Sequence, residues 1–319
     1  MLRANNSHVI NFLIFLLLSS LPKNVFSDFA FITNQESNKL DIIDLRKKEK
    51  ILEVNVGKNP AGIFIDKKSK NIFISNPGSH NISKFNFRKK TQSFLEVGKS
   101  PMGVFFSNNN LLVSNWFQNE VSVFNLEKNK LKKKIKVGKS PAGILVVEEN
   151  QELFVANKED NNISVINLKD FKEIKKIKVG KAPYGIFSEP ESDYVFVTNV
   201  QSNSISIIDK VNLSVVDEIK VGNWPYQIAI NKKNDKIYVT NQRDNSITII
   251  DVIKKKVLET LVDVCEYPEG IDISYNENLI VVACWFEDNI ILLDLYNNNF
   301  VKKISVSGGP RSFGKFILD

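Results

Sequence analysis

The sequence predicts an all-β fold, a seven-bladed β-propeller made of four-stranded blades. The first observation is a turn of the type V-G-K-x-P, which recurs every 40 to 43 residues. Its prolines are Pro60, Pro101, Pro141, Pro183, Pro225, Pro268 and Pro310. The second is a short apolar run ending in asparagine, such as the one that ends at Asn199, between successive prolines. A repeat of this length with several short β-type runs is typical of propeller blades.

Each repeat contains four short runs of strand-forming residues separated by turn-forming residues. Between Pro183 and Gly222 these runs are 184–187, 194–198, 204–208 and 215–221. They are rich in Val, Ile and Phe, and clusters of Asn, Asp, Gly, Pro and Ser separate them, which favours an antiparallel meander. No stretch of the repeats has a sustained 3.6-residue apolar period, so we expect almost no helix.

The ends of the repeat region predict how the ring closes. Residues 29–33 have the sequence of a second strand but lack a first strand before them. Residues 312–318 have the sequence of a first strand but lack the rest of a blade. Together they predict a composite blade, with three strands from the N-terminal side and one from the C-terminal end. Such closure leaves few open sheet edges.

These motifs resemble those of the YVTN family of β-propeller repeat proteins. The literal motif stands at Tyr238-Val-Thr-Asn241, and an N-x-I-S-V-I-type strand follows at 160–167 and 244–251. The resemblance covers nearly all of the chain after residue 28 and implies a propeller fold. It implies no single activity, because propellers carry enzymes, carriers and scaffolds alike.

Residues 1–27 are predicted to be a signal peptide, and residues 28–319 the propeller. Arg3 precedes an apolar run at 12–18, and Val25-Phe-Ser27 provides a cleavage site before Asp28. The apolar run is too short to span a bilayer. We therefore expect a periplasmic or secreted protein, monomeric and without a membrane span after cleavage.

The two cysteines are predicted to form a disulfide. Cys265 stands where the other turns have glycine, and Cys284 stands where the other motifs have asparagine. Both positions should lie at the same end of the last full blade, and an exported protein is exposed to oxidising conditions. A redox or metal pair is the alternative, but no C-x-x-C spacing and no nearby histidine support it.

Aromatic residues gather in the loops that should meet at one end of the ring. All three tryptophans lie in the inter-blade turns or directly after the motif position. The candidate binding residues of this face are the aromatics Trp116, Phe117, Tyr184, Trp224, Tyr226, Tyr267, Trp285 and Phe286 together with Arg243. An aromatic, mildly basic rim is typical of a binding surface for a partner chain, a glycan or a nucleic-acid strand. Alternatively, the rings pack between blades and seal this end.

The charge balance suggests, but does not require, an anionic partner. The formal net charge is +7. One lysine follows the glycine of each of four turns, at Lys58, Lys99, Lys139 and Lys181. Four like charges around one mouth could attract an anion, although lysine is also an ordinary solvated turn residue. The single glycines of the turns are expected where the backbone φ is demanding.

No catalytic residue, metal site or cofactor is expected. His80 is the single histidine after residue 27, which argues against a Ser-His-Asp triad and against His-ligated haem. Glu266, Glu269 and Glu287 form the acidic group of the aromatic face. They are expected to be solvated or paired with Arg243 or Arg311; a divalent cation is the alternative.

Three functions from different classes are compatible with this sequence. The first is an exported, non-catalytic binding or scaffold propeller whose macromolecular partner is an envelope protein, a polysaccharide or a nucleic acid. The second is a metal-assisted hydrolase or lactonase that uses the three glutamates. The third is a surface-layer repeat that associates with itself.

Overall fold

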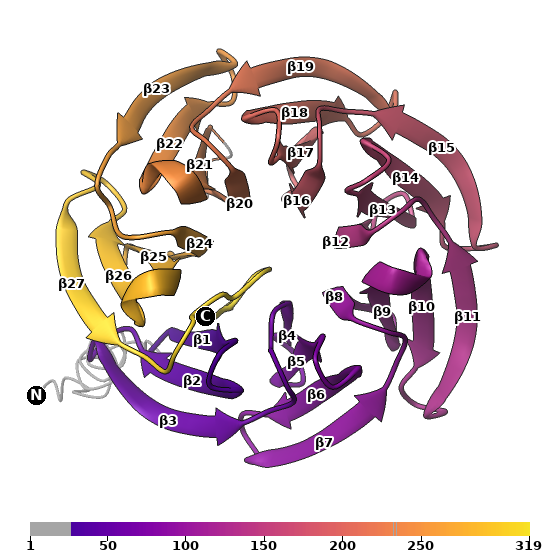
Figure 1. Ribbon diagram of the computed structural model, residues 1–319, viewed down its shortest axis with the longest axis horizontal. Coiled ribbons are helices and arrows are strands. Elements are labelled where there is room, and N and C mark those ends of the chain that lie inside the picture. The colour runs from indigo at the N-terminus through magenta and orange to yellow at the C-terminus, as the bar shows by residue number, and fades with distance from the viewer. Residues whose placement is uncertain (1–26, 232, 234) are drawn as a thin grey trace, which may run out of the picture.

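Seven antiparallel four-stranded sheets form a closed ring around a central axis (Figure 1). The computed structural model describes residues 27–231, 233 and 235–319. The predicted all-β, seven-bladed fold is therefore confirmed. The predicted signal peptide lies almost entirely outside the described residues. Within them, no helix is long and apolar enough to cross a membrane.

The strands follow each other from the axis to the rim in every blade. Blade 1 contains β28 (Ile317–Leu318), β1 (Phe29–Asn34), β2 (Lys39–Asp44) and β3 (Glu49–Asn55). Blade 2 contains β4 (Ile63–Asp66), β5 (Asn71–Asn76), β6 (Asn81–Asn86) and β7 (Thr91–Glu96). Blade 3 contains β8 (Pro101–Ser107), β9 (Asn110–Asn115), β10 (Glu120–Asn125) and β11 (Lys130–Lys136). Blade 4 contains β12 (Pro141–Val147), β13 (Glu152–Asn157), β14 (Asn162–Asn167) and β15 (Lys172–Lys178).

The last three blades repeat this order. Blade 5 contains β16 (Pro183–Phe187), β17 (Tyr194–Asn199), β18 (Ser204–Asp209) and β19 (Ser214–Lys220). Blade 6 contains β20 (Pro225–Ile230), β21 (Lys236–Asn241), β22 (Ser246–Asp251) and β23 (Lys256–Leu261). Blade 7 contains β24 (Pro268–Ser274), β25 (Leu279–Cys284), β26 (Asn289–Asp294) and β27 (Phe300–Ser305). The helices of the described part are the single 3₁₀ turns η1 (Trp116–Gln118), η2 (Gln242–Asp244) and η3 (Trp285–Glu287).

The core lies between neighbouring blades. The aromatic residue that opens the motif strand is fully buried in four blades, at Phe31, Phe73, Phe154 and Phe196. The motif hydroxyl then joins one blade to the next: Ser114 Oγ donates to the Ala142 carbonyl at 2.6 Å, and Thr240 Oγ1 to the Glu269 carbonyl at 2.7 Å. Because the motif supplies both the apolar contact and the hydrogen bond, one short run specifies the packing of a whole blade.

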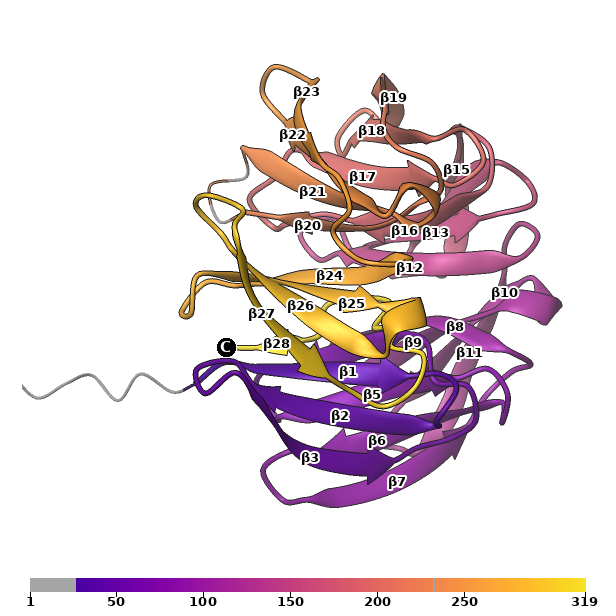
Figure 2. The same ribbon diagram turned by 60° about the vertical axis from the view of Figure 1, so that its left-hand side comes forward.

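The composite blade is also confirmed, although its C-terminal strand is shorter than predicted. Only Ile317–Leu318 pairs as a strand with β1. Gly314 adopts a φ of +132°, and a Cβ there would lie 2.2 Å from the Ile63 carbonyl oxygen, so the segment bends toward blade 2. Phe313 forms a bridge with Gly62 instead. Figure 1 shows this yellow segment reaching the centre of the ring, and Figure 2 shows β28 between β24 and β1.

The inter-blade turns share one backbone conformation and one hydrogen bond. The residue before each turn proline has a positive φ, from Asn59 (+53°) to Gly309 (+68°). Its N–H is accepted by a side chain from the preceding blade, usually asparagine, as in Ser140 N to Asn119 Oδ1 at 3.1 Å. His80 takes this place in blade 2, where Nδ1 accepts the Ser100 N–H at 3.2 Å. The histidine is therefore a turn residue in the structure.

The turn glycines serve a different purpose from the expected one. Gly57, Gly98, Gly138, Gly180 and Gly222 are not among the residues with positive φ, so the expectation of a demanding φ is wrong. Glycine is required at these positions because the side chain of the motif asparagine packs directly against the backbone and leaves no space for a Cβ. A Cβ on Gly98 would lie 2.3 Å from the Asn115 Cγ, closer than any unstrained contact.

The predicted disulfide is confirmed and occupies this same glycine–asparagine contact. Cys265 and Cys284 are joined in blade 7, with their Cα atoms 5.9 Å apart. A covalent bond thus replaces the packing of an amide on a glycine.

We expect reduction of this disulfide to lower the free energy of unfolding by about 3 kcal/mol, because the bond closes a loop with a sequence separation of 19 residues. Urea unfolding with and without dithiothreitol measures the difference. The Cys265→Gly/Cys284→Asn variant, which restores the residues of the other blades, is the control and should not respond to dithiothreitol. An equal response of both proteins would contradict the assignment.

Candidate functional site

A cup of about 530 Å³ opens at the end of the ring where the inter-blade turns and the motif loops meet. Its lining residues are Gln35, Ser100, Met102, Trp116, Phe117, Lys158, Tyr184, Val200, Trp224, Tyr226, Gln242, Tyr267, Glu269, Trp285, Phe286 and Arg311. We call this cavity the cup. All three tryptophans of the chain line it. Its volume is within the range of ordinary ligand pockets.

Two positions of the repeat supply most of the lining. The residue after the motif position contributes Gln35, Trp116, Lys158, Val200, Gln242 and Trp285. The residue after the turn proline contributes Met102, Tyr184, Tyr226, Glu269 and Arg311. The first position forms the wall of the cup and the second its floor. The lining therefore comes from two repeat positions whose residue type differs from blade to blade.

Arg311 organises the floor. Its Nε donates to the Tyr226 hydroxyl at 2.7 Å, Nη1 to Gln35 Oε1 at 3.0 Å, and Nη2 to the Tyr184 hydroxyl at 3.1 Å. Burial alone would lower the pKa of Arg311, but Glu269 and the two tyrosines raise it well above its usual value. The guanidinium therefore stays charged and fixes residues from blades 1, 5 and 6 at the axis.

Glu269 is the buried acid of the floor. Its Oε1 accepts from Gln242 Nε2 at 2.9 Å, and its Oε2 lies 3.3 Å from Arg311 Nε. That nitrogen already donates its single hydrogen to Tyr226, so Oε2 has no hydrogen-bond donor in the described residues. Burial raises the pKa of Glu269 to about 7, and Arg311 opposes the rise. The carboxyl group thus changes charge near neutral pH.

The aromatic residues predicted from sequence divide into two groups. Tyr184 and Tyr226 are buried against Phe313, with ring centroids 4.9 and 5.5 Å from its ring, and they seal the channel. Trp116, Trp224, Tyr267 and Trp285 are only partly buried. Phe117 and Phe286 project into solvent, with 72% and 65% of their surface exposed. Packing therefore accounts fully for the tyrosines of the floor, whereas Trp116 and Trp224 pack against the same cluster with part of each ring still exposed.

None of the cations predicted for the binding face lines the cup. Lys58, Lys99, Lys139 and Lys181 are exposed on the turns, and none of them lines the cup. Arg243 lies outside the cavity lining, with its guanidinium carbon 3.4 Å from the Trp224 ring centroid. The cations that do line the cup are Lys158 and Arg311. Sequence reasoning missed Lys158, although it follows Asn157 as Trp116 follows Asn115.

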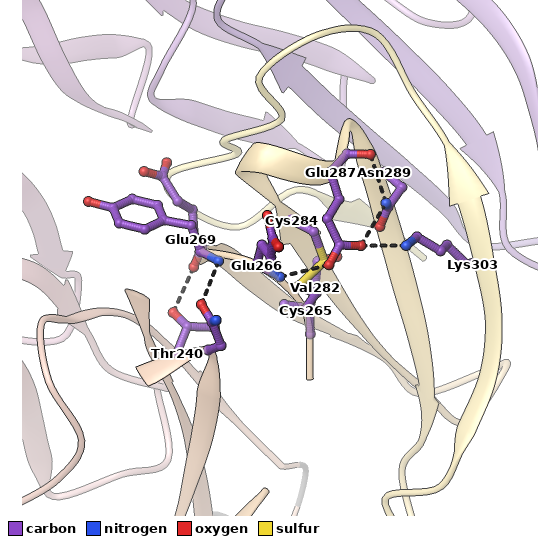
Figure 3. Close-up of a disulfide and its surroundings, with 11 residues drawn as sticks. Thr240, Cys265, Glu266, Glu269, Val282, Cys284, Glu287, Asn289 and Lys303 are labelled. Carbon is purple, nitrogen blue, oxygen red and sulfur yellow. Dashed lines mark hydrogen bonds and ion pairs between the residues drawn. A yellow bond between two sulfur atoms is a disulfide. The ribbon is translucent and has the colours of Figure 1, made fainter. Parts of the chain in front are cut away.

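The three glutamates do not converge on one point. Glu287 accepts the Glu266 N–H at 2.8 Å and an Asn289 amide hydrogen, and it forms an ion pair with Lys303. Figure 3 shows Glu269 on the Thr240 side, apart from Glu266 and Glu287. Among the described residues, no group of three or more His, Cys, Asp or Glu side chains is arranged to hold a metal ion. The donor set therefore does not fit the predicted alternative of a glutamate-bound cation.

The comparisons with known proteins identify the fold. No family model and no curated protein matches the sequence. Among solved structures, a functionally unknown protein of Desulfotomaculum acetoxidans superposes with a TM-score of 0.78 at 13% identity, over 89% of this chain and 98% of that one. A provisionally assigned 6-phosphogluconolactonase of Bacteroides fragilis gives 0.77 at 14%, over 91% and 98%. Hydrazine synthase of Kuenenia stuttgartiensis gives 0.71 at 19%, over 79% and 88%. At these identities the similarity shows a β-propeller and no more.

Proposed function

We propose that this protein is an exported, monomeric, non-catalytic binding propeller that recognises a macromolecular ligand with the cup. The observation that carries the proposal is that all three tryptophans line one cavity. They remain partly exposed there, whereas the aromatic residues of the motif strands are buried between the blades. Tryptophan and tyrosine dominate recognition surfaces because they bury a large area with few rotatable bonds. The motifs support membership of the YVTN group of propellers.

Two features support the binding role over an enzymatic one, and a third supports export. In the floor Arg311 donates to Tyr226, Glu269 accepts from Gln242, and the two charged groups lie 3.3 Å apart, so both already have partners within the protein. Glu269 lies apart from Glu266 and Glu287 (Figure 3), so these acids are not paired for acid–base work. The disulfide fits an oxidising compartment outside the cytoplasm, as the signal peptide predicts.

We expect the Trp116→Ala/Trp285→Ala variant to lose roughly a hundredfold in affinity while it keeps its fold, because each ring is a rim residue at the mouth of the cup. The probes are immobilised polygalacturonate, dextran and single-stranded oligodeoxythymidylate, measured by biolayer interferometry with residues 28–319. Phe94→Ala is the matched control, because Phe94 is an exposed aromatic residue on the outer strand of blade 2.

Two results would contradict the proposal. Unfolding of the double variant, shown by circular dichroism, would mean that the rings are structural. Hydrolysis of a lactone by the wild-type chain that disappears in Glu269→Gln would mean that the cup is an active site.

A further inference from the structure

The hydrogen-bonding groups that the cup leaves free are mostly donors. Arg311 has one further N–H on each Nη, and within the described residues these hydrogens have no acceptor. Gln35 uses its carbonyl oxygen for Arg311, so its amide hydrogens are also free in the described part. A ligand that satisfies this floor must bring acceptor atoms.

Lys158 adds an unpaired positive charge at the wall. Its Nζ lies 5.0 Å from the centroid of the Trp116 ring, and it forms no ion pair with any described residue. The charged residues of the lining are Lys158, Arg311 and Glu269, so the cup is positive whether or not Glu269 is ionised. Since blades 4 and 7 lie across the ring from each other (Figure 1), a ligand that touches both Lys158 and Trp285 must span the cup.

The walls present flat aromatic faces between these donors. Trp116, Trp224 and Trp285 come from three different blades and are partly exposed. Their own cations already lie against them: Arg243 on Trp224, Lys158 on Trp116, and Arg311 at 5.6 Å from Trp285. These groups would repel a cationic ligand, whereas they would attract a ring that carries an anionic substituent.

On this basis we propose that the ligand of the cup is a carboxylated saccharide, with sugar rings on the tryptophans and a carboxylate toward Lys158 and the floor donors. The inference rests on the proposed binding function and names its ligand class. A nucleic-acid strand is a poorer fit, because such strands follow an elongated cationic groove. Here the turn lysines lie outside the cup, and Arg311 and Phe313 close its floor.

The test is isothermal titration of residues 28–319 with trigalacturonate, maltotriose and a short oligodeoxythymidylate. We expect binding of trigalacturonate, with affinity for maltotriose at least tenfold lower. Lys158→Gln should weaken trigalacturonate binding about tenfold, the value of one charge-assisted hydrogen bond. Lys139→Gln is the matched control, because Lys139 is an exposed lysine outside the cup, and it should change nothing.

Three other outcomes would overturn the inference, and they show whether the proposed binding function fails with it. Equal binding of maltotriose and trigalacturonate would remove the requirement for a carboxylate while the binding function stands. Binding of the oligonucleotide alone would replace the saccharide with a nucleic acid, and the binding function would again stand. If trigalacturonate binds but Trp116→Ala/Trp285→Ala leaves that binding intact, both the ligand assignment and the cup as binding site fail.

Discussion

Removal of residues 313–319 is expected to prevent stable folding. The segment contributes four buried apolar side chains, Phe313, Phe316, Ile317 and Leu318. Loss of one buried phenylalanine alone costs about 3–5 kcal/mol, and a whole domain is stable by only about 5–15 kcal/mol. The deletion also leaves the partly buried Asp272 carboxylate without the Phe316 and Ile317 N–H groups, from which it accepts hydrogen bonds at 2.7 and 2.9 Å. Circular dichroism and thermal unfolding of the truncated chain measure the effect.

Two point variants separate the closure of the ring from a general effect of truncation. Phe316→Ala removes a fully buried ring and should lower the free energy of unfolding by about 3–5 kcal/mol. Phe117→Ala removes a ring that is 72% exposed and should change stability by less than about 0.5 kcal/mol. A truncated chain that unfolds at the wild-type temperature would show that β28 is dispensable.

The fold could be predicted almost completely because each blade repeats the same short sequence motifs. The buried motif aromatic, the inter-blade hydroxyl and the left-handed residue before proline recur with the period of the sequence, so one unit can be checked against six others. The departures have local causes. The C-terminal strand is short because Gly314 turns it toward Ile63, and the turn glycines are required by the asparagine that packs on them.

The site could be predicted only in part, because it is built from residues that break the repeat. The rim aromatics were found since tryptophan is rare and conspicuous at equivalent positions. The floor was predicted only in part: Tyr184, Tyr226 and the pairing of a glutamate with Arg311 were expected. The hydrogen bonds of Arg311 to Gln35, Tyr184 and Tyr226 were not, because these residues meet only after the ring has closed. No local pattern reveals a contact between residues that are 276 positions apart. Comparison of the post-proline positions across blades would have shown that polar and aromatic residues cluster in blades 5, 6, 7 and 1.

The second large effect concerns Arg311. We expect Arg311→Met to lower the free energy of unfolding by about 3–5 kcal/mol when measured above pH 7, because Glu269 must then either stay as an unpaired buried charge or take up a proton, and because two buried tyrosines lose their donor. Glu269→Gln in the same background should recover part of this loss, because the amide carries no charge. Urea unfolding of the wild type, both single variants and the double variant gives the coupling free energy. Additive losses would show that the two groups do not interact.

Glu269 also sets the pH dependence of stability. Its pKa in the folded protein is about 7, above its ordinary value of 4.5, so between these values the native state holds a proton that the unfolded chain has lost. Stability from this group is therefore greatest at low pH and declines as pH rises through the folded pKa. Arg311, Tyr226 and Tyr267 are the charged or titratable groups that face it. Arg311 keeps its charge throughout, and burial keeps both tyrosines neutral in this range.

Unfolding measured across this pH range should thus show a decline in the wild type that is shallower in Glu269→Gln. Asp272, whose pKa burial raises to about 6 against the opposing effect of Lys315, and Glu152, whose pKa burial also raises, contribute to the slope that remains. Identical slopes in the two proteins would show that Glu269 is already ionised at low pH, held so by Arg311. The same comparison therefore decides whether the floor of the cup is a proton-binding network or a permanent ion pair.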